Sequence, residues 1–367
     1  MQNRLAYLDV LRLLSVVLVI FGHYVMVGGG ATEIPGIISD SFPLPLYDQT
    51  NWQLWKFEIF MIEKFSTQAS ILGVTLFFIV TGYLMPMMLD RYTRRNFLVN
   101  RFFRIFPVLF VATIVLGTFV GATQGIIFSI PSYIASWTLT YLLVGVVPIA
   151  GVLWTLVIEV LFYAFAIILG KFSMHKLFLL QVVLLVLILV SVQNVDAYYL
   201  ALAATQSKYL LTICLGSAIF LAEKEDNWLH KFALVFGSFV LAYLGFQVYR
   251  IGHKEISTYN NLGTYISALT LFLIFYSLSK FNFLNRLPKA ISWFAVLVYP
   301  IYLLHAGIGL GVMALMRNTT TEPYSLLVAA ISSTLFISWL LHKYIEKPGI
   351  AVGRSLVRRF EFTKGDS

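Results

Sequence analysis

The sequence predicts an all-α membrane protein, a polytopic bundle of about ten transmembrane helices with both termini in the cytoplasm. Of the 367 residues, 59% are hydrophobic and only 12% are charged, whereas about 25% of an ordinary soluble domain is charged. A soluble chain of this composition could not bury so much apolar surface away from water. In a membrane protein, the lipid bilayer surrounds the apolar surface in place of water. The other two reasons are the long apolar runs along the chain and the uneven placement of its basic residues.

Apolar runs long enough for a membrane helix, about 20 residues, recur along the chain. We interpret the first as an uncleaved helix, because it carries Asp9 and Arg12 and no small-residue cleavage site follows it. The run at 209–222 is short, and we expect its helix to begin earlier. The ten predicted spans are Leu8–Val27, Ile71–Met88, Phe103–Phe119, Val152–Leu169, Leu177–Val192, Tyr209–Ala222, Phe232–Tyr249, Leu262–Leu278, Ile291–Met316 and Tyr324–Leu341.

The basic residues predict the orientation, because cytoplasmic segments are enriched in Lys and Arg. With ten spans and a cytoplasmic N-terminus, nineteen of the 26 Lys and Arg residues fall inside, and Arg12 falls within the first span. This pattern explains the net charge of +9 without a nucleic-acid partner. We expect a transmembrane domain at 1–350 and a basic cytoplasmic tail at 351–367. The six outside residues are Lys56, Lys64, Lys208, Arg250, Lys254 and Arg317.

Two external segments are unusual for loops. Residues 28–70 begin acidic and rich in Gly and Pro, then become amphipathic and aromatic, which favours an interfacial helix in the second part. Residues 120–151 carry no charge. They are too apolar for a free loop, so we expect a re-entrant segment, a buried segment or a pair of short helices.

Ionisable side chains inside spans are costly and are usually functional. Arg12 and His23 are 11 residues apart, so they fall within about 20° of one helix face and about 16 Å apart along its axis. One face would carry a cation near the cytoplasm and an imidazole near the outside. Alternatively, Arg12 extends to the membrane surface with Asp9 as its partner, and His23 is an interfacial histidine.

Glu159 and His305 also fall in the outer halves of their predicted spans. Each alone has a structural interpretation, as a paired carboxylate or a packing histidine. Together with His23 they favour a polar cavity that opens outward, because ionisable groups at one depth can satisfy each other only by sharing a site.

The cytoplasmic run from Asp90 to Arg104 is denser in arginine than topology requires. It either anchors the chain at anionic lipid or binds phosphate, since guanidinium forks match phosphate oxygens. Arg101 and Arg104 would share a helix face. The single cysteine, Cys214, excludes an intrachain disulfide and a thiolate metal cluster. The sequence contains no Walker loop, dinucleotide-binding fingerprint or zinc spacing.

Six motifs follow one another along the chain: Arg-x10-His at Arg12 and His23, the glycine- and phenylalanine-rich run Gly73–Tyr83, R-x-x-R-I-F-P at Arg101–Pro107, W-T-L-x-x-E-x-x-F-Y at Trp154–Tyr163, Y-x-I-Y-L-x-H at Tyr299–His305, and E-x-P at Glu346–Pro348. Together and in this order they resemble the acyltransferase-3 family of membrane-bound O-acyltransferases. In the second motif, Thr81 replaces the family's usual Ser, and Thr75 stands where many members have Asp, so a role for that carboxylate does not carry over.

The resemblance implies an acyl-coenzyme A donor on the cytoplasmic side, most often acetyl-CoA. Because the sequence has no zinc spacing and only one cysteine, we expect no metal. The resemblance further implies transfer to a hydroxyl of a glycan, such as a bacterial polysaccharide, lipopolysaccharide or lipid-linked oligosaccharide, at the inner membrane. His23 is then the best candidate for the general base. Glu159 would orient it or act as a base itself, and His305 would stabilise the oxyanion or relay the acyl group. Arg12, Arg101 and Arg104 would hold coenzyme A.

Two other classes stay open on the residues alone. A transporter or glycan flippase would use the same ionisable groups as a proton or substrate path, although we find no internal repeat of the kind that builds many transporters. A membrane scaffold or receptor would not require charge inside its spans.

Overall fold

A computed structural model describes residues 6–27, 46–49, 52–254, 262–281, 289–320 and 322–362. Every regular element in these ranges is a helix. The contacts between residues divide the chain into two compact units. Unit 1 consists of Met1–Ser15, Met61–Arg94 and Thr155–Pro288, and unit 2 of Val16–Phe60, Arg95–Trp154 and Lys289–Ser367.

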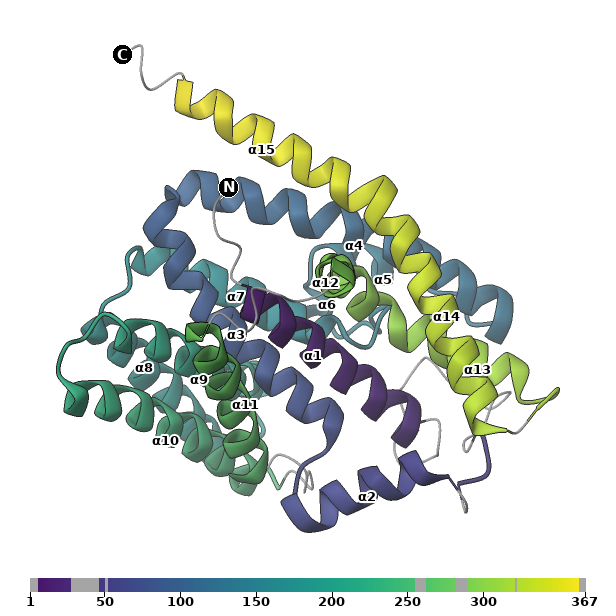
Figure 1. Cartoon of the computed structure of the whole chain (residues 1–367), viewed down its shortest axis with the longest axis horizontal. Coiled ribbons are helices and arrows are strands. Elements are labelled where there is room, and N and C mark those ends of the chain that lie inside the picture. The colour runs from purple at the N-terminus through teal and green to yellow at the C-terminus, as the bar shows by residue number, and fades with distance from the viewer. Residues whose placement is uncertain are drawn as a thin grey trace. The chain divides into compact units, whose positions relative to one another are not determined.

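Unit 1 is built around a central helix, α9. This helix makes its main contacts with α3, α8 and α10, and the last two run beside it in Figure 1. α11 packs on α3. The N-terminal part of α1 and most of α7 also belong to this unit. The bounds are α1 Ala6–Gly22, α3 Ala69–Arg91, α7 Leu153–Leu169, α8 Met174–Gln193, α9 Tyr198–Ala222, α10 Trp228–Gly252 and α11 Leu262–Lys280.

Glycines let α3 and α9 cross closely. A Cβ at Gly82 would lie 1.8 Å from the carbonyl oxygen of Ile213, and one at Gly216 would lie 2.0 Å from that of Ile79. Small residues allow such close backbone approach in membrane bundles. Pro86 contributes as well, because proline cannot donate to the carbonyl four residues earlier.

That carbonyl belongs to Gly82, and the hydroxyl of Ser217 donates to it at 2.8 Å. The crossing is therefore held by a hydrogen bond between α3 and α9 as well as by packing.

Unit 2 contains the second half of α1 with its continuation η1, most of α4, and the C-terminal helices. α14 contacts α12, η3 and α13, while η1 contacts η3. Figure 1 shows α14 and α15 as one long helix, joined through η4. The bounds are η1 His23–Val27, α4 Arg94–Gln124, α5 Ile130–Trp137, α6 Tyr141–Val144, α12 Lys289–Leu304, η3 His305–Leu310, α13 Gly311–Met316, α14 Pro323–Leu341, η4 His342–Glu346 and α15 Lys347–Phe362.

Each of the ten predicted spans overlaps a helix. Eight helices in the described residues are long and apolar enough to cross a membrane, which confirms a polytopic helical membrane protein. The other two predicted spans are α7, with 17 residues, and α9, with 25. α9 begins at Tyr198, earlier than the apolar run, as expected. Many of its polar residues, among them Gln206, Ser207 and Thr212, are buried. Lys208, which the predicted topology placed outside the spans, is also buried within this helix, so that part of the prediction is wrong. A helix surrounded by protein does not need a fully apolar surface.

The segment 120–151 contains two short helices, one of the three alternatives expected for it. α5 begins with Ser129 as its N-cap and Pro131 in its first turn, a common start for a helix. It packs on α4, where the indole of Trp137 donates to the Thr113 hydroxyl at 2.7 Å. The aromatic part of segment 28–70 forms helix α2, Gln53–Phe65.

We expected a basic tail to begin at residue 351. In the structure, residues 351–362 are part of helix α15, which ends at Phe362. Arg4, Arg286, Lys364 and residues 28–45 lie outside the described residues, so the predictions that concern them stay predictions.

Candidate functional site

His23 and His305 meet in unit 2 although 282 positions separate them. Nδ1 of His23 lies 2.7 Å from Nε2 of His305. Each histidine begins a π-helical turn, His23 in η1 and His305 in η3. Such turns insert an extra residue into the helical ladder and occur often at functional sites. The two turns contact each other, so the pairing of the histidines involves their backbones as well.

The two imidazoles are aligned edge to edge. Their planes differ by 9° and their centroids are 5.0 Å apart. The centroid separation is larger than the 2.7 Å distance between the two nitrogens by roughly the sum of the two ring radii. Both nitrogens therefore lie near the line that joins the ring centroids. The geometry is that of an in-plane hydrogen bond between imidazoles, not of stacked faces.

The backbone decides which nitrogens carry protons. Nδ1 of His305 lies 2.7 Å from the carbonyl oxygen of Tyr302. A carbonyl can only accept, so this nitrogen must be protonated. In the neutral ring Nε2 of His305 is then an acceptor, and Nδ1 of His23 must donate to it. The remaining nitrogen of His23, Nε2, is left with a free lone pair.

His23 is half-buried, whereas His305 is fully buried. The pair therefore has one shielded end, fixed by a carbonyl, and one end whose basic nitrogen lies on the more accessible ring. A nucleophile or general base oriented by a second group has this arrangement. The sequence predicted that the two histidines share a site, and the structure confirms their proximity.

Two tyrosine hydroxyls hold the backbone around the pair. Tyr24 is buried and donates to the carbonyl oxygen of His305 at 3.0 Å, and its oxygen also lies 2.9 Å from the hydroxyl of Thr334 on α14. Tyr47 donates to the carbonyl oxygens of Val25, in a short contact, and of Tyr24, at 3.4 Å. Carbonyls in the distorted turn η1 thereby gain partners that a regular helix would not need.

Arg101 and Arg104 lie on α4, also in unit 2, and both are half-buried. The guanidinium of Arg101 is over the ring of Phe97, 5.6 Å from its centroid. Their motif ends in Pro107, which leaves the carbonyl of Phe103 without its helical donor. A Cβ at Gly349 would lie 2.8 Å from that carbonyl oxygen.

Gly353, one turn further along α15, is also close to Phe103. A Cβ added to this glycine would lie 2.9 Å from the Cβ of Phe103. The two glycines, four residues apart, let α15 pack directly on the α4 segment that carries the arginines. Helix α15, near the C-terminus, therefore packs against the part of α4 that carries Arg101 and Arg104.

Arg12 and Glu159 both belong to unit 1. Arg12 is half-buried on α1, in the continuous helical span Ala6–Met26 that also carries His23. Glu159 is half-buried on α7, and its Oε1 accepts a short hydrogen bond from Tyr163, one turn later. The tyrosine, which is part of the same motif, gives the carboxylate a local partner inside the span.

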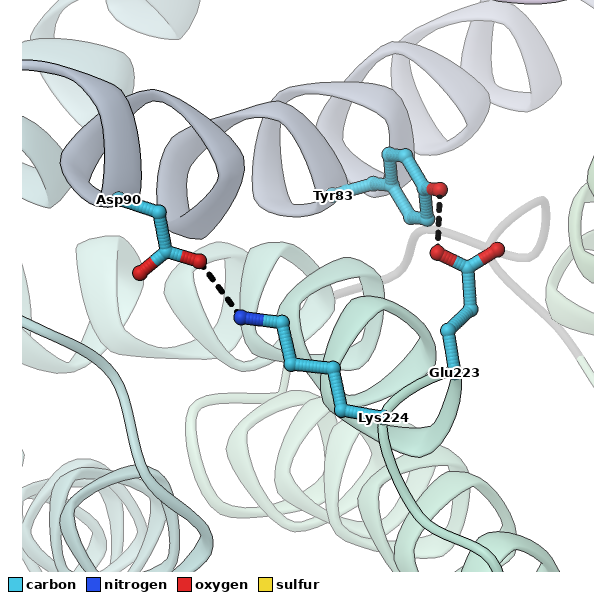
Figure 2. A network of polar contacts seen from close by, with 4 residues as sticks. All are labelled: Tyr83, Asp90, Glu223 and Lys224. Atoms are coloured by element: carbon cyan, nitrogen blue, oxygen red, sulfur yellow. Dashed lines mark hydrogen bonds and ion pairs between the residues drawn. The ribbon is translucent and has the colours of Figure 1, made fainter.

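The motif at Gly73–Tyr83 also lies in unit 1. Its second glycine, Gly82, allows the close crossing of α3 and α9. Its last residue, Tyr83, donates to Oε2 of Glu223 at the end of α9, at 2.7 Å (Figure 2). Beside it, Lys224 is 2.5 Å from Asp90. Because this ion pair is largely exposed to solvent, it contributes little stability. In the described residues this motif acts mainly in packing.

His342, which is not among the predicted site residues, pairs with Glu346. Nδ1 of His342 lies 2.8 Å from Oε2 of Glu346, and the carboxylate is buried, 2% exposed. His342 is the first residue and Glu346 the last residue of η4, which is a third π-helical turn that begins with a histidine. The spacing of four residues, together with the E-x-P motif, was the available signal for this pair. The Tyr302 carbonyl left no signal, because backbone acceptors are common to all residues.

Comparison with known proteins identifies the family. The profile of the acyltransferase-3 family, described as an acyltransferase domain, matches residues 5–343, most of the chain. Neither curated proteins nor solved structures gave a match. The matched range includes His23, His305 and the arginine motif, while Glu346 lies just beyond it. The chain therefore belongs to the acyltransferase-3 family and is a multi-pass membrane acyltransferase.

Proposed function

We propose that the protein transfers an acetyl group from acetyl-coenzyme A to a hydroxyl of a cell-surface or lipid-linked glycan at the bacterial inner membrane. The observation that carries the proposal is the pair His23 and His305, whose hydrogen bonds leave Nε2 of His23 as a free base. A sugar hydroxyl is a weak nucleophile and must lose its proton as it attacks a thioester.

His23 takes that proton in the proposed reaction. The hydroxyl oxygen forms a bond to the thioester carbonyl carbon, and Nε2 of His23 accepts the hydroxyl proton. The carbon–sulfur bond then breaks, and the leaving thiolate of coenzyme A takes the proton from the imidazolium. The products are the acetyl ester and free coenzyme A, and His23 is neutral again.

His305 orients the base in this scheme. Its Nε2 accepts from Nδ1 of His23 throughout, so the imidazolium that forms is stabilised by a fixed acceptor. Both nitrogens of His305 are engaged, one by His23 and one by the Tyr302 carbonyl. This favours orientation over the covalent relay that the sequence left open.

The donor would be held by arginines. Arg101 and Arg104 lie on one helix and present guanidinium groups suited to the phosphates of coenzyme A, and Arg12 stays a further candidate for a coenzyme A contact. Glu159, with its partner Tyr163, stays the second candidate for a base.

The test uses purified full-length protein, radiolabelled acetyl-coenzyme A and glycans extracted from membranes. We expect label in the glycan fraction, release of one free thiol per acetyl group transferred, and loss of the same acetyl ester from surface glycans when the gene is deleted, seen by mass spectrometry. Transport of unmodified glycan without thiol release would instead support the flippase alternative.

A further inference from the structure

Unit 2 contains a pocket of about 700 Å³ that the proposed chemistry has not used. It lies between the segment that precedes α2 and the turn that joins α13 to α14. Its volume is typical of pockets that hold small ligands. Its lining includes Asp48, Trp52, Arg317, Asn318, Glu322 and Tyr324.

The lining combines aromatic rings with hydrogen-bonding groups of both kinds. Carboxylates accept, the guanidinium donates, and amide and hydroxyl groups do both. A sugar ring has the matching chemistry, since its edges carry hydroxyls and its faces carry C–H groups that pack on aromatic rings. Tyr324 is 48% exposed and offers such a ring.

The indole N–H of Trp52 is a buried donor without an acceptor among the described residues. Trp52 is 2% exposed, and its indole Nε1 is shielded from water with no hydrogen-bond partner in the part of the chain that the structure describes. Buried donors nearly always have an acceptor, so an exception requires an explanation. Its ring meets that of Tyr324 edge to face, with centroids 6.0 Å apart. Trp52 lines the pocket, so a ligand hydroxyl bound there would supply the acceptor that this donor lacks.

The pocket wall is connected to the histidine pair through one residue. The ring of Tyr47 packs edge to face on Trp52, with centroids 4.6 Å apart. The hydroxyl of the same Tyr47 donates to the carbonyl of Val25, in the turn that His23 begins. Trp52, which lines the pocket, therefore packs on the residue that supports the turn of the proposed base.

The charges of the lining disfavour an acidic ligand. The lining contains two carboxylates, Asp48 and Glu322, and one guanidinium, Arg317. Glu322 stays ionised, because the backbone N–H of Ser325 donates to its Oε2 at 2.6 Å and lowers the pKa of the carboxyl. One oxygen serves this helix cap, and a carboxylate has acceptor capacity on the other.

We propose that this pocket binds a sugar ring of the acceptor glycan and prefers a neutral sugar to an acidic one. The inference rests on the proposed function, because it gives the place where the acceptor of that reaction binds. Nε1 of Trp52 donates to a sugar hydroxyl, and the ring of Tyr324 packs on a sugar face.

Binding without donor tests the proposal independently of activity. Full-length protein, in a detergent without a sugar headgroup, is titrated with the methyl glycosides of glucose, galactose, mannose and N-acetylglucosamine and with methyl glucuronide, followed by ligand-observed NMR. Trp52→Phe keeps a ring and removes the N–H, and we expect affinity to fall roughly threefold to tenfold. Tyr324→Ala, at an exposed position, should also weaken binding. Trp228→Phe removes an N–H at a site 70% exposed and should change nothing.

Binding of at least one neutral glycoside, weakened by both pocket variants and not by the control, supports the proposal. No binding of any neutral glycoside, equal binding by all variants, or a preference for methyl glucuronide overturns it. Acetyl transfer to the same glycosides is measured separately. Binding without transfer contradicts only the proposed function, whereas transfer with an unchanged acceptor KM in Trp52→Phe contradicts only the pocket assignment.

Discussion

Gly309 lies so close to the hydroxyl of Tyr24 that a Cβ on the glycine would come within 1.9 Å of it. The close approach lets Tyr24 reach the His305 carbonyl and Thr334. Only a residue without a side chain fits there while both hydrogen bonds persist.

Gly309→Ala should displace the Tyr24 hydroxyl and with it the turn that carries His305. We expect acyl transfer to fall about tenfold or more, because small misplacements of reacting groups are costly, while affinity for acyl-coenzyme A is kept. The control is Gly121→Ala on α4, where a Cβ would have an ordinary contact of 3.5 Å. Equal transfer rates for both variants would contradict the role of this contact.

His23→Ala should reduce acylation by about 10²–10⁴-fold, the usual cost of losing a general base. The variant should still insert and bind acyl-coenzyme A. Near-normal acylation at matched expression would leave His23 as an interfacial histidine and move the base role to Glu159.

His305 should act through His23, and two substitutions separate this from a purely structural role. His305→Gln places an amide oxygen where Nε2 accepts, and it should retain much of the turnover that His305→Ala loses. The pH dependence of kcat should shift in His305→Ala, because the partner of the base has changed. If the two variants lose equal turnover with the same pH profile, His305 only fills space.

Arg101→Ala and Arg104→Ala should weaken donor binding more than acceptor binding. Each lost charge-assisted contact with a phosphate should cost about 1.5–3 kcal/mol. Arg95→Ala is the control, an exposed cation on the same helix. Reduced protein level with unchanged KM for acyl-coenzyme A would identify the arginines as topological anchors.

Gly82→Ala should destabilise unit 1, because the helices α3 and α9 must separate to admit a methyl group. We expect a loss of about 1–3 kcal/mol, as for other overpacked sites, measured as a lower Tm in detergent. Gly237→Ala on α10 has open space around its Cβ and should instead be neutral or slightly stabilising. A Tm for Gly82→Ala as high as that of the control would refute the close crossing.

The sequence by itself determined the helices, the membrane class and the candidate site residues. The apolar runs are local and long, so they indicated the helices and the membrane class without knowledge of packing. His23 and His305 stood out because ionisable groups in apolar runs are costly. The motif order then indicated the family, which the comparison confirms.

Only the tertiary structure decided how these residues act. The 2.7 Å contact between His23 and His305 joins residues 282 positions apart, and no local periodicity encodes such a pairing. The tautomer of the pair depends on the Tyr302 carbonyl, and backbone atoms are identical in every residue. The histidines begin π-helical turns because packing and hydrogen bonds from Tyr24 and Tyr47 stabilise a distortion that helix propensity alone disfavours. Chemistry at this site is therefore set by distant contacts, while the helices that carry it follow from the local sequence.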